Sequence, residues 1–296
     1  MQAKGDHTPR PRWPASGTIV VVALVGRGVF VAFDARAVSA AAVGRTLGGA
    51  RLSGFAREPL LPGALAPSAA GRNLGNAAEV REAMGRALQR LGHGGGRVTL
   101  VLPDGVARLA LVTLAADADA REYVRFRLAG SLPWPAADGL VEVLPLGRGQ
   151  VIGAAVRRAT VAEYEQLASS AGLASERVHL APLLALAGVA RSREAVHVML
   201  GDTAVSLAAV RDGAVAAFRS RRRDLAEGEA TRLLEEATRT ARLAGDGASA
   251  PRLVFSGSDA TRLCARAGAE AAAGVAGTGE WPEAAEAAWL PGVVTA

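Results

Sequence analysis

Residues 98–135 constrain the fold of this chain more than any other stretch. They contain an apolar run that ends at Pro103 and Asp104, a second apolar run that ends at Leu114, and a helical pattern that ends at two prolines around Trp134. Proline has no backbone N–H and cannot continue a helix or a central strand, so each proline marks an element boundary. The stretch therefore predicts a strand, a second strand and a helix, in that order.

Strands and helices alternate along the rest of the chain. Residues 18–25 and 29–34 are two predicted strands joined by a glycine-bearing turn, and residues 39–47 are a short helix or a loop. Residues 48–62 lack periodicity, apart from an edge strand at 51–55. Further strands are predicted at 140–146, 150–156, 177–180, 196–200, 204–210, 214–219 and 252–255. Further helices are predicted at 77–91, 160–170, 182–189, 226–243 and 260–267.

The chain reads as two halves that each begin with a β-hairpin and continue with alternating elements. The second hairpin has Asp212-Gly213 between its strands, a pair that favours a tight two-residue turn. This order predicts a duplicated α/β layout. Four segments are expected: a flexible tail at 1–16, a first subdomain at 17–97, an inserted α/β subdomain at 98–190, and a second domain with the C-terminal segment at 191–296.

Charge and cysteine content narrow the functional classes. The formal charge is +6, and it is carried almost entirely by arginine because Lys4 is the only lysine. No aromatic side chains interleave with the arginines at 219–223, so nucleic acid is not the expected partner, although a basic nucleic-acid binder stays an alternative. A single cysteine excludes an internal disulfide. Residues 18–33 are interrupted by glycine and are too short for a spanning helix, which predicts a cytoplasmic protein.

Familiar catalytic motifs are missing from the sequence. There is no GxSxG element, and Lys4 lies outside any glycine-rich loop, so a P-loop is excluded from the body of the chain. The four histidines have no His or Cys at the spacing of a zinc site on a helix. The sequence therefore predicts neither a metal site nor an enzyme of these classes.

Most of the sequence, from about residue 18 to residue 267, resembles the PilM-type proteins of type IV pilus assembly. The strand 98–103 with Asp104 resembles the family's LPD strand, and the helix end at 132–135 resembles its IPFP terminus. The hairpin around 205–213 resembles the family's TSLSVVRDG run. The cytoplasmic part of the type II secretion protein GspL is a relative with a similar pattern. The resemblance implies an actin-like, FtsA-like fold, which is a ribonuclease H-like duplicated fold with an inserted α/β subdomain.

The family resemblance also implies an ATP site between two hairpin loops, and the sequence departs from the family's pattern there. Where the family has DIG after the first strand of each half, this chain has Leu24-Val25-Gly26 and Met199-Leu200-Gly201. Leucine and methionine cannot hold a Mg²⁺-bound water, so we expect no ATPase activity and no required cofactor, with ATP binding left open. The candidate nucleotide contacts are Gly26, Arg27, Gly28, Gly201, Asp202, Thr203, Gly257 and Ser258.

By resemblance, the expected function is a scaffold that docks the cytoplasmic tail of a PilN-like membrane protein at the inner-membrane face. The candidate partner contacts are Arg125, Phe126 and Trp134, because exposed aromatic and arginine side chains make good anchors. Phe126 in a helix core, and Trp134 as a cap on its own subdomain, are alternatives. Self-association into a homo-oligomer is left open. The alternative function is an ATP-binding, actin-like ATPase of the same machinery.

Overall fold

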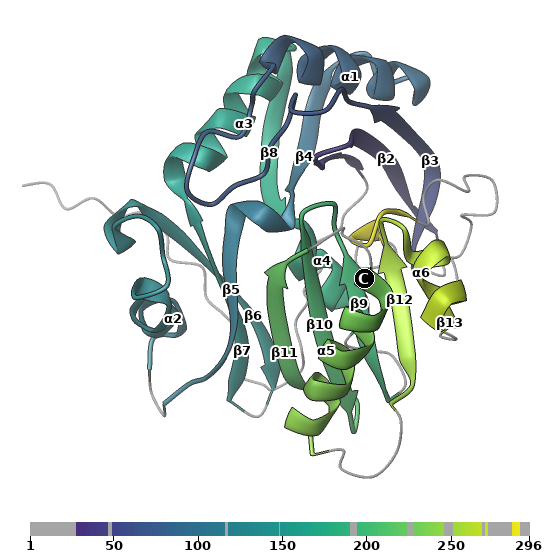
Figure 1. Cartoon of the computed structure of the whole chain (residues 1–296). Coiled ribbons are helices and arrows are strands. Elements are labelled where there is room, and N and C mark those ends of the chain that lie inside the picture. The colour runs from purple at the N-terminus through teal and green to yellow at the C-terminus, as the bar shows by residue number, and fades with distance from the viewer. Residues whose placement is uncertain are drawn as a thin grey trace, which may run out of the picture.

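The computed structural model of the chain describes residues 28–46, 49–115, 118–147, 149–189, 194–223, 228–245, 251–267, 270–271 and 286–290. In these ranges the chain forms two five-stranded sheets and one three-stranded sheet, with helices packed against each (Figure 1). None of the helices in these ranges is both long enough and apolar enough to cross a membrane.

The first half of the molecule is built on a sheet in the order β3-β2-β1-β4-β8. Strand β1 pairs antiparallel with β2 and parallel with β4, and β4 pairs parallel with β8. The strands are β1 (Gly28–Phe33), β2 (Ala37–Thr46), β3 (Gly49–Pro59), β4 (Gly96–Leu102) and β8 (Leu173–Leu180). The helices are α1 (Ala77–Arg90), α3 (Arg158–Ser170) and α4 (Ala181–Val189).

The second half repeats the strand order of the first. Its sheet runs β11-β10-β9-β12-β13, again a meander of three antiparallel strands followed by parallel neighbours. The strands are β9 (Ala195–Leu200), β10 (Ala204–Arg211), β11 (Ala214–Arg222), β12 (Leu253–Gly257) and β13 (Glu270–Ala271). The helices are α5 (Glu229–Leu243) and α6 (Ala260–Ala267). The predicted duplicated α/β layout is confirmed.

The third sheet, in the order β5-β7-β6, forms an inserted subdomain between β4 and α3. It contains β5 (Ala107–Thr113), α2 (Ala120–Ala129), β6 (Gly139–Gly147) and β7 (Gln150–Arg157), with short 3-10 turns at Asp104–Val106 and Ala136–Asp138. In Figure 1 this sheet lies beside β11 of the second half, and α2 covers its outer side. Because β4 and β8 belong to the first sheet, the inserted sheet is narrower than the predicted range 98–190.

The position of the first hairpin differs from the prediction. Residues 18–25 lie outside the described residues, and the antiparallel partner of β1 is β2. The turn is therefore at 34–36, where Asp34 N donates to Ala37 O at 2.9 Å and Ala35 N donates to the Asp34 carboxylate at 3.0 Å. An Asp side chain that bonds the backbone ahead of it makes a tight turn without glycine. The glycines at 26–28 suggested a turn before β1, whereas the observed hairpin turn follows β1.

Residues 39–62 were predicted correctly only in the edge strand at 51–55, which lies within β3 at the edge of the sheet. The predicted helix or loop at 39–47 is most of β2, and the largely aperiodic stretch 48–62 contains the eleven-residue strand β3. Alanine-rich β2 has no intrinsic preference for a strand, but its small side chains are buried on both faces of the sheet. A register shift between Ala42 and Val43 breaks the alternation that the sequence pattern depends on.

The two faces of the first sheet are covered by different segments. Val31 and Phe33 face α1 and α3, where they pack in a core with residues such as Met84 and Tyr164. Phe30 and its neighbours on the opposite face pack against Leu184 of α4 and the C-terminal residues 286–290. Alternate residues of one strand thus reach opposite layers. This arrangement fixes the end of β1, and the turn that follows it, between the two halves.

Candidate functional site: the cleft between the halves

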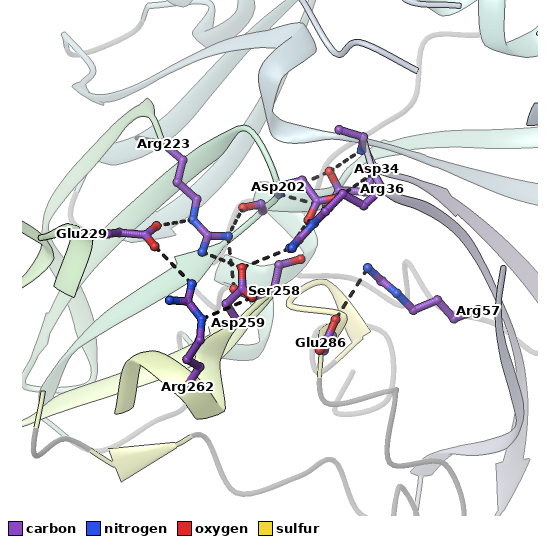
Figure 2. Close-up of polar contacts among 12 residues, drawn as sticks. Asp34, Arg36, Arg57, Asp202, Arg223, Glu229, Ser258, Asp259, Arg262 and Glu286 are labelled. Atoms are coloured by element: carbon purple, nitrogen blue, oxygen red, sulfur yellow. Dashed lines mark hydrogen bonds and ion pairs between the residues drawn. The ribbon is translucent and has the colours of Figure 1, made fainter. Parts of the chain in front are cut away.

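The β1–β2 turn of the first half meets the β9–β10 turn of the second half (Figure 2). Asp34 and Arg36 lie in the first turn, and Asp202 lies in the second. The backbone N of Arg36 donates to the Asp202 carboxylate at 2.8 Å, and Arg36 Nε donates to the same carboxylate at 2.7 Å. In return, the backbone N of Asp202 donates to both Asp34 oxygens at 3.3 Å. Hydrogen bonds therefore cross the cleft in both directions.

A second arginine organises the side of the cleft that belongs to the second half. The side chain of Arg223 is fully buried at the end of β11 and donates to Glu229 at 2.6 Å and to Asp259 at 2.9 Å. It also donates to the carbonyl of Gly201 at 2.8 Å and to that of Ser258 at 3.2 Å. A buried guanidinium needs this number of acceptors, because it cannot lose its proton. Arg223 thereby fixes the β9–β10 turn relative to α5 and α6.

Three carboxyl groups meet in the cleft with different proton affinities. Burial, together with the negative charges of Asp202 and Asp104, raises the pKa of Asp34 well above its usual value. Burial also raises the pKa of Asp104 to about 7. Burial acts in the same direction on Asp202, but the hydrogen bonds and the charge of Arg36 outweigh it and lower the pKa of Asp202. Asp202 therefore ionises at lower pH than an ordinary aspartate, whereas Asp34 and Asp104 hold their protons to higher pH.

The remaining space in the cleft is small. The cavity beside Asp34 and Asp104 has a volume of about 30 Å³. That is room for one or two water molecules, and it is far below the several hundred Å³ of a typical ligand site. The C-terminal residues 286–290 close it from one side, with Trp289 packed on Phe30 at a ring distance of 6.4 Å and Glu286 paired to Arg57 at 3.6 Å.

The structure brings together the predicted nucleotide contacts of the second half, but the backbone amides of Gly201, Asp202 and Ser258 are already bonded. Gly201 N donates to Ala204 O at 3.0 Å, and Ser258 N donates to Leu200 O at 2.9 Å. Gly257 has φ +91°, and a Cβ there would lie 2.1 Å from the Leu200 carbonyl, so close strand packing alone requires glycine. Thr203 accepts a bond from Arg223 N at 2.9 Å.

Of the predicted contacts in the first half, the structure places only Gly28. Gly26 and Arg27 fall outside the described residues, and Gly28 begins β1 opposite Val43, away from the turn. Leu24 also falls outside the described residues, whereas Met199 is buried inside β9 and the turn that follows β9 carries Asp202. Met199 therefore does not mark the position of an acid at that turn.

Sequence reasoning missed the residues that build the cleft: Asp34, Arg36, Asp104, Arg223 and Asp259. A weak signal was present, since Asp34 and Asp104 each follow an apolar strand directly or after one proline. Within the described residues, no group of three His, Cys, Asp or Glu side chains is arranged to hold a metal ion.

The three predicted partner contacts differ in exposure. Phe126 on α2 is 77% exposed, and Arg125 beside it forms an ion pair with Glu122 of the same helix. Trp134 is only 7% exposed, and its Nε1 donates to the carbonyl of Ala69 at 2.8 Å. The prediction of Trp134 as a surface contact is therefore wrong. It is a core residue that ties the inserted subdomain to the loop before α1, as its proline-flanked position allows.

A larger groove lies on the first half, outside the cleft. It has a volume of about 520 Å³ and is lined by α1, α3 and the loop at 71–74. Arg72, Arg81 and Arg157 contribute positive charge to its wall. Glu163 also lines it, but its carboxylate accepts bonds from the backbone N–H groups of Asn73 and Leu74 and so fixes the loop. Arg72 pairs with Glu163 at 3.6 Å. The lining therefore carries three arginines and one glutamate, and its net charge is positive.

The duplicated sheets with facing turns define an actin-like fold. The structure overlaps the PilM-PilN type IV pilus biogenesis complex with a TM-score of 0.69 and 18% identity, over 91% of this chain and 98% of that chain. It overlaps a Bacteroides thetaiotaomicron protein with an actin-like ATPase fold and unknown function with a TM-score of 0.58 and 9% identity, over 95% of this chain and 100% of that chain.

The cytoplasmic domain of EpsL, an inner-membrane component of the type II secretion system of Vibrio cholerae, is also similar. It has a TM-score of 0.47 and 11% identity over 77% of this chain and 80% of that chain. No protein-family model and no curated protein matches the sequence. The overlaps with the PilM-PilN complex and the Bacteroides protein establish the fold, and the activity has to be inferred from the site.

Proposed function

We propose that this protein is a docking scaffold of a type IV pilus or type II secretion-like assembly platform, at the cytoplasmic face of the inner membrane. The observation that carries the proposal is the overlap of nearly the whole chain with the PilM-PilN complex. The partner is then the cytoplasmic tail of a PilN-like membrane protein. In this role the chain binds and positions its partner, and no chemical step is needed.

The cleft supports a scaffold without nucleotide turnover. A phosphate-binding loop offers free backbone N–H groups, whereas the amides of Gly201, Asp202 and Ser258 are bonded within the protein. A cavity of about 30 Å³ does not admit a nucleotide in this arrangement of the halves. These two features favour a degenerate nucleotide site.

The groove beside α1 and α3 is the best candidate for the tail-binding site. Its volume of about 520 Å³ suits several residues of an extended peptide. Arg72, Arg81 and Arg157 favour a segment that offers carboxylates or backbone carbonyls. Trp134 supports this site indirectly, because its bond to Ala69 holds the start of the loop that forms one wall.

Arg125 and Phe126 remain proposed contacts of a second surface. Phe126 is exposed on a helix whose other face, including Val124 and Leu128, is buried against the inserted sheet. An aromatic side chain with this exposure can be buried by a partner at little conformational cost. Arg125 beside it can add a charged contact.

The groove is tested with charge reversal and a fluorescently labelled tail peptide of the PilN-like partner. Replacing Arg81 and Arg157 by Glu should weaken the peptide's affinity at least about tenfold, since the wall of the groove would then repel the carboxylates of the peptide. Arg242→Glu, on the exposed end of α5 in the second half, is the matched control and should bind the peptide as the wild type does. Equal affinity of all three proteins would exclude the groove.

One observation favours the alternative of an actin-like ATPase. Asp34 and Asp202 both lie in the turns that face each other, so the carboxylates that such an enzyme uses are present. The alternative predicts Mg²⁺-dependent ATP hydrolysis by the purified chain, with loss of the activity in an Asp34→Asn variant. The scaffold proposal predicts no turnover above background with either protein.

A further inference from the structure

We infer that Arg36 is a built-in latch that holds the two halves of the molecule in one relative arrangement without a ligand. Arg36 belongs to the β1–β2 turn of the first half, while its partners Asp202 and Asp259 belong to the second half (Figure 2). The latch goes beyond the docking function and does not depend on it. It concerns how the cleft is kept closed.

Arg36 binds the second half through both its side chain and its backbone. Its Nη2 lies 2.6 Å from the Asp202 carboxylate and 3.2 Å from the Asp259 carboxylate, so one guanidinium joins two segments of the second half. Its backbone N and Nε bind Asp202 as well. Contacts from both backbone and side chain define the orientation of the turn, whereas an ordinary surface ion pair restrains only side-chain tips.

In the second half, the acceptors of Arg36 are held in place by other contacts. Asp259 has a φ of +64°, a left-handed conformation that is uncommon for a residue other than glycine. Its carboxylate lies between Arg36 and Arg223, at 3.2 Å and 2.9 Å. The buried Arg223 also binds Gly201 O in the turn that carries Asp202. Backbone strain at one residue that binds two arginines indicates a position held by its surroundings.

Arg36 also balances a concentration of negative charge. Asp34, Asp202 and Asp259 all face the cleft near it, and Asp104 lies at the floor. Arg57 lies in the same region and pairs with Glu286. Without the Arg36 charge, the Asp202 carboxylate would lose its counter-ion beside the buried Asp34 and Asp104, and the cost of keeping that charge unpaired would favour separation of the halves.

Hydrogen–deuterium exchange of the purified chain tests the latch, with no peptide and no nucleotide present. In an Arg36→Gln variant, the amides of Asp202 and residue 36, which donate across the cleft, should exchange on the order of tenfold faster or more than in the wild type. Small-angle scattering should show a larger radius of gyration. Arg36→Lys keeps the charge without the planar fork and should fall between the two.

The matched control is Arg86→Gln, which removes an ion pair to Glu58 inside the first half. It should leave the exchange at Asp202 unchanged. Exchange in the core amides of β9 and α1 reports whether each variant is folded. If Arg36→Gln does not fold, Asp259→Asn, which removes the negative charge of one Arg36 partner, should still show faster exchange at the Arg36 turn. Wild-type exchange at both turns in the folded variants would overturn the latch, whatever the peptide binds.

Discussion

The two halves repeat one sheet order, yet their facing turns differ in one respect. The turn of the second half contains Gly201 and Asp202, and it contributes an acid to the cleft. The turn of the first half contains Asp34 and Arg36, and it contributes both an acid and a base. The difference shows how a duplicated fold can hold its halves together from inside, because a cation of one copy satisfies an anion of the other.

The halves differ again in what they add to the common sheet. Between β4 and α3 the first half carries the inserted sheet with α2, whereas the second half passes from β12 directly to α6. The basic groove and the exposed Phe126 both belong to the first half and its insertion. The surfaces proposed for partner binding therefore lie on one half, while the second half supplies the carboxylates that close the cleft.

Removal of Arg223 should have the largest effect on stability and should fall on the second half. Arg223→Ala leaves Glu229 and Asp259 without their buried partner, which costs about 3–5 kcal/mol of unfolding free energy. Urea denaturation followed by circular dichroism measures it. Arg242→Ala, an exposed arginine of α5, is the control and should change stability by less than about 0.5 kcal/mol. A loss similar to that of the control would show that the network does not hold the second half together.

Truncation of Trp134 should be nearly as costly, and it tests the first half. Trp134→Ala removes a buried indole and its hydrogen bond to Ala69, for a loss of about 3 kcal/mol or more. A second effect should be faster amide exchange in the loop at 71–74, because the Trp134 bond fixes the start of that loop. Unchanged loop exchange in a folded variant would show that Trp134 does not order the loop that lines the groove.

The pH dependence of stability distinguishes the acids of the cleft. The pKa of Asp104 is raised from 3.8 to about 7, so between these values the folded protein binds more protons than the unfolded chain. Stability therefore falls as pH rises through this window, by at most about 1.4 kcal/mol per pH unit for this group. In Asp104→Asn the fall should be smaller, and the variant should be more stable than the wild type at pH 8.

Asp202 and Asp259 respond in the opposite sense. Their pKa values are lowered, Asp202 by Arg36 and Asp259 by Arg36 and Arg223, both against the effect of burial. Their contribution is present above the unfolded value of 3.8 and is lost as pH falls below it. Thermal unfolding of the wild type and Asp104→Asn between pH 3 and pH 8 checks both signs. If the stability of the two proteins changed with pH in parallel across the whole range, Asp104 would not contribute to the pH dependence.

Substitution of Phe126 should have the smallest effect on stability. Its side chain is 77% exposed, so Phe126→Ser should change the unfolding free energy by less than about 0.5 kcal/mol. Affinity for the full cytoplasmic domain of the partner should fall, as measured by isothermal titration calorimetry. Leu243→Ser, which alters another exposed apolar residue at the end of α5, is the control. Equal binding by the wild type and both variants would exclude Phe126 as a partner contact and leave the groove as the proposed surface.

The sequence predicts the second half better than the first for a physical reason. Asp212 and Gly213 have φ values of +49° and +69° in the β10–β11 turn, so the pair that predicts the hairpin is the pair that forms it. The β1–β2 turn contains no glycine, and alanine-rich β2 has no strand signature. The residues of the turn therefore predicted the hairpin in the second half, but not in the first.

The cleft itself could not be predicted from local patterns. Arg36 and Asp202 are 166 positions apart, and Arg36 and Asp259 are 223 apart, so only the folded topology brings them together. The partner of Trp134 could not be predicted for a similar reason, because its acceptor Ala69 is 65 positions earlier in a loop without periodicity. The predictions of an actin-like fold and a duplicated layout used whole-chain order, and both are confirmed.

The central claim is that this protein binds the tail of a membrane partner without using nucleotide. Titration of a labelled PilN-like tail peptide into the purified chain, with and without saturating Mg-ATP, tests it most directly. The scaffold account predicts saturable binding with the same affinity in both conditions and no release of phosphate. Binding that requires Mg-ATP, or phosphate release that accompanies it, would contradict the account and favour an ATPase.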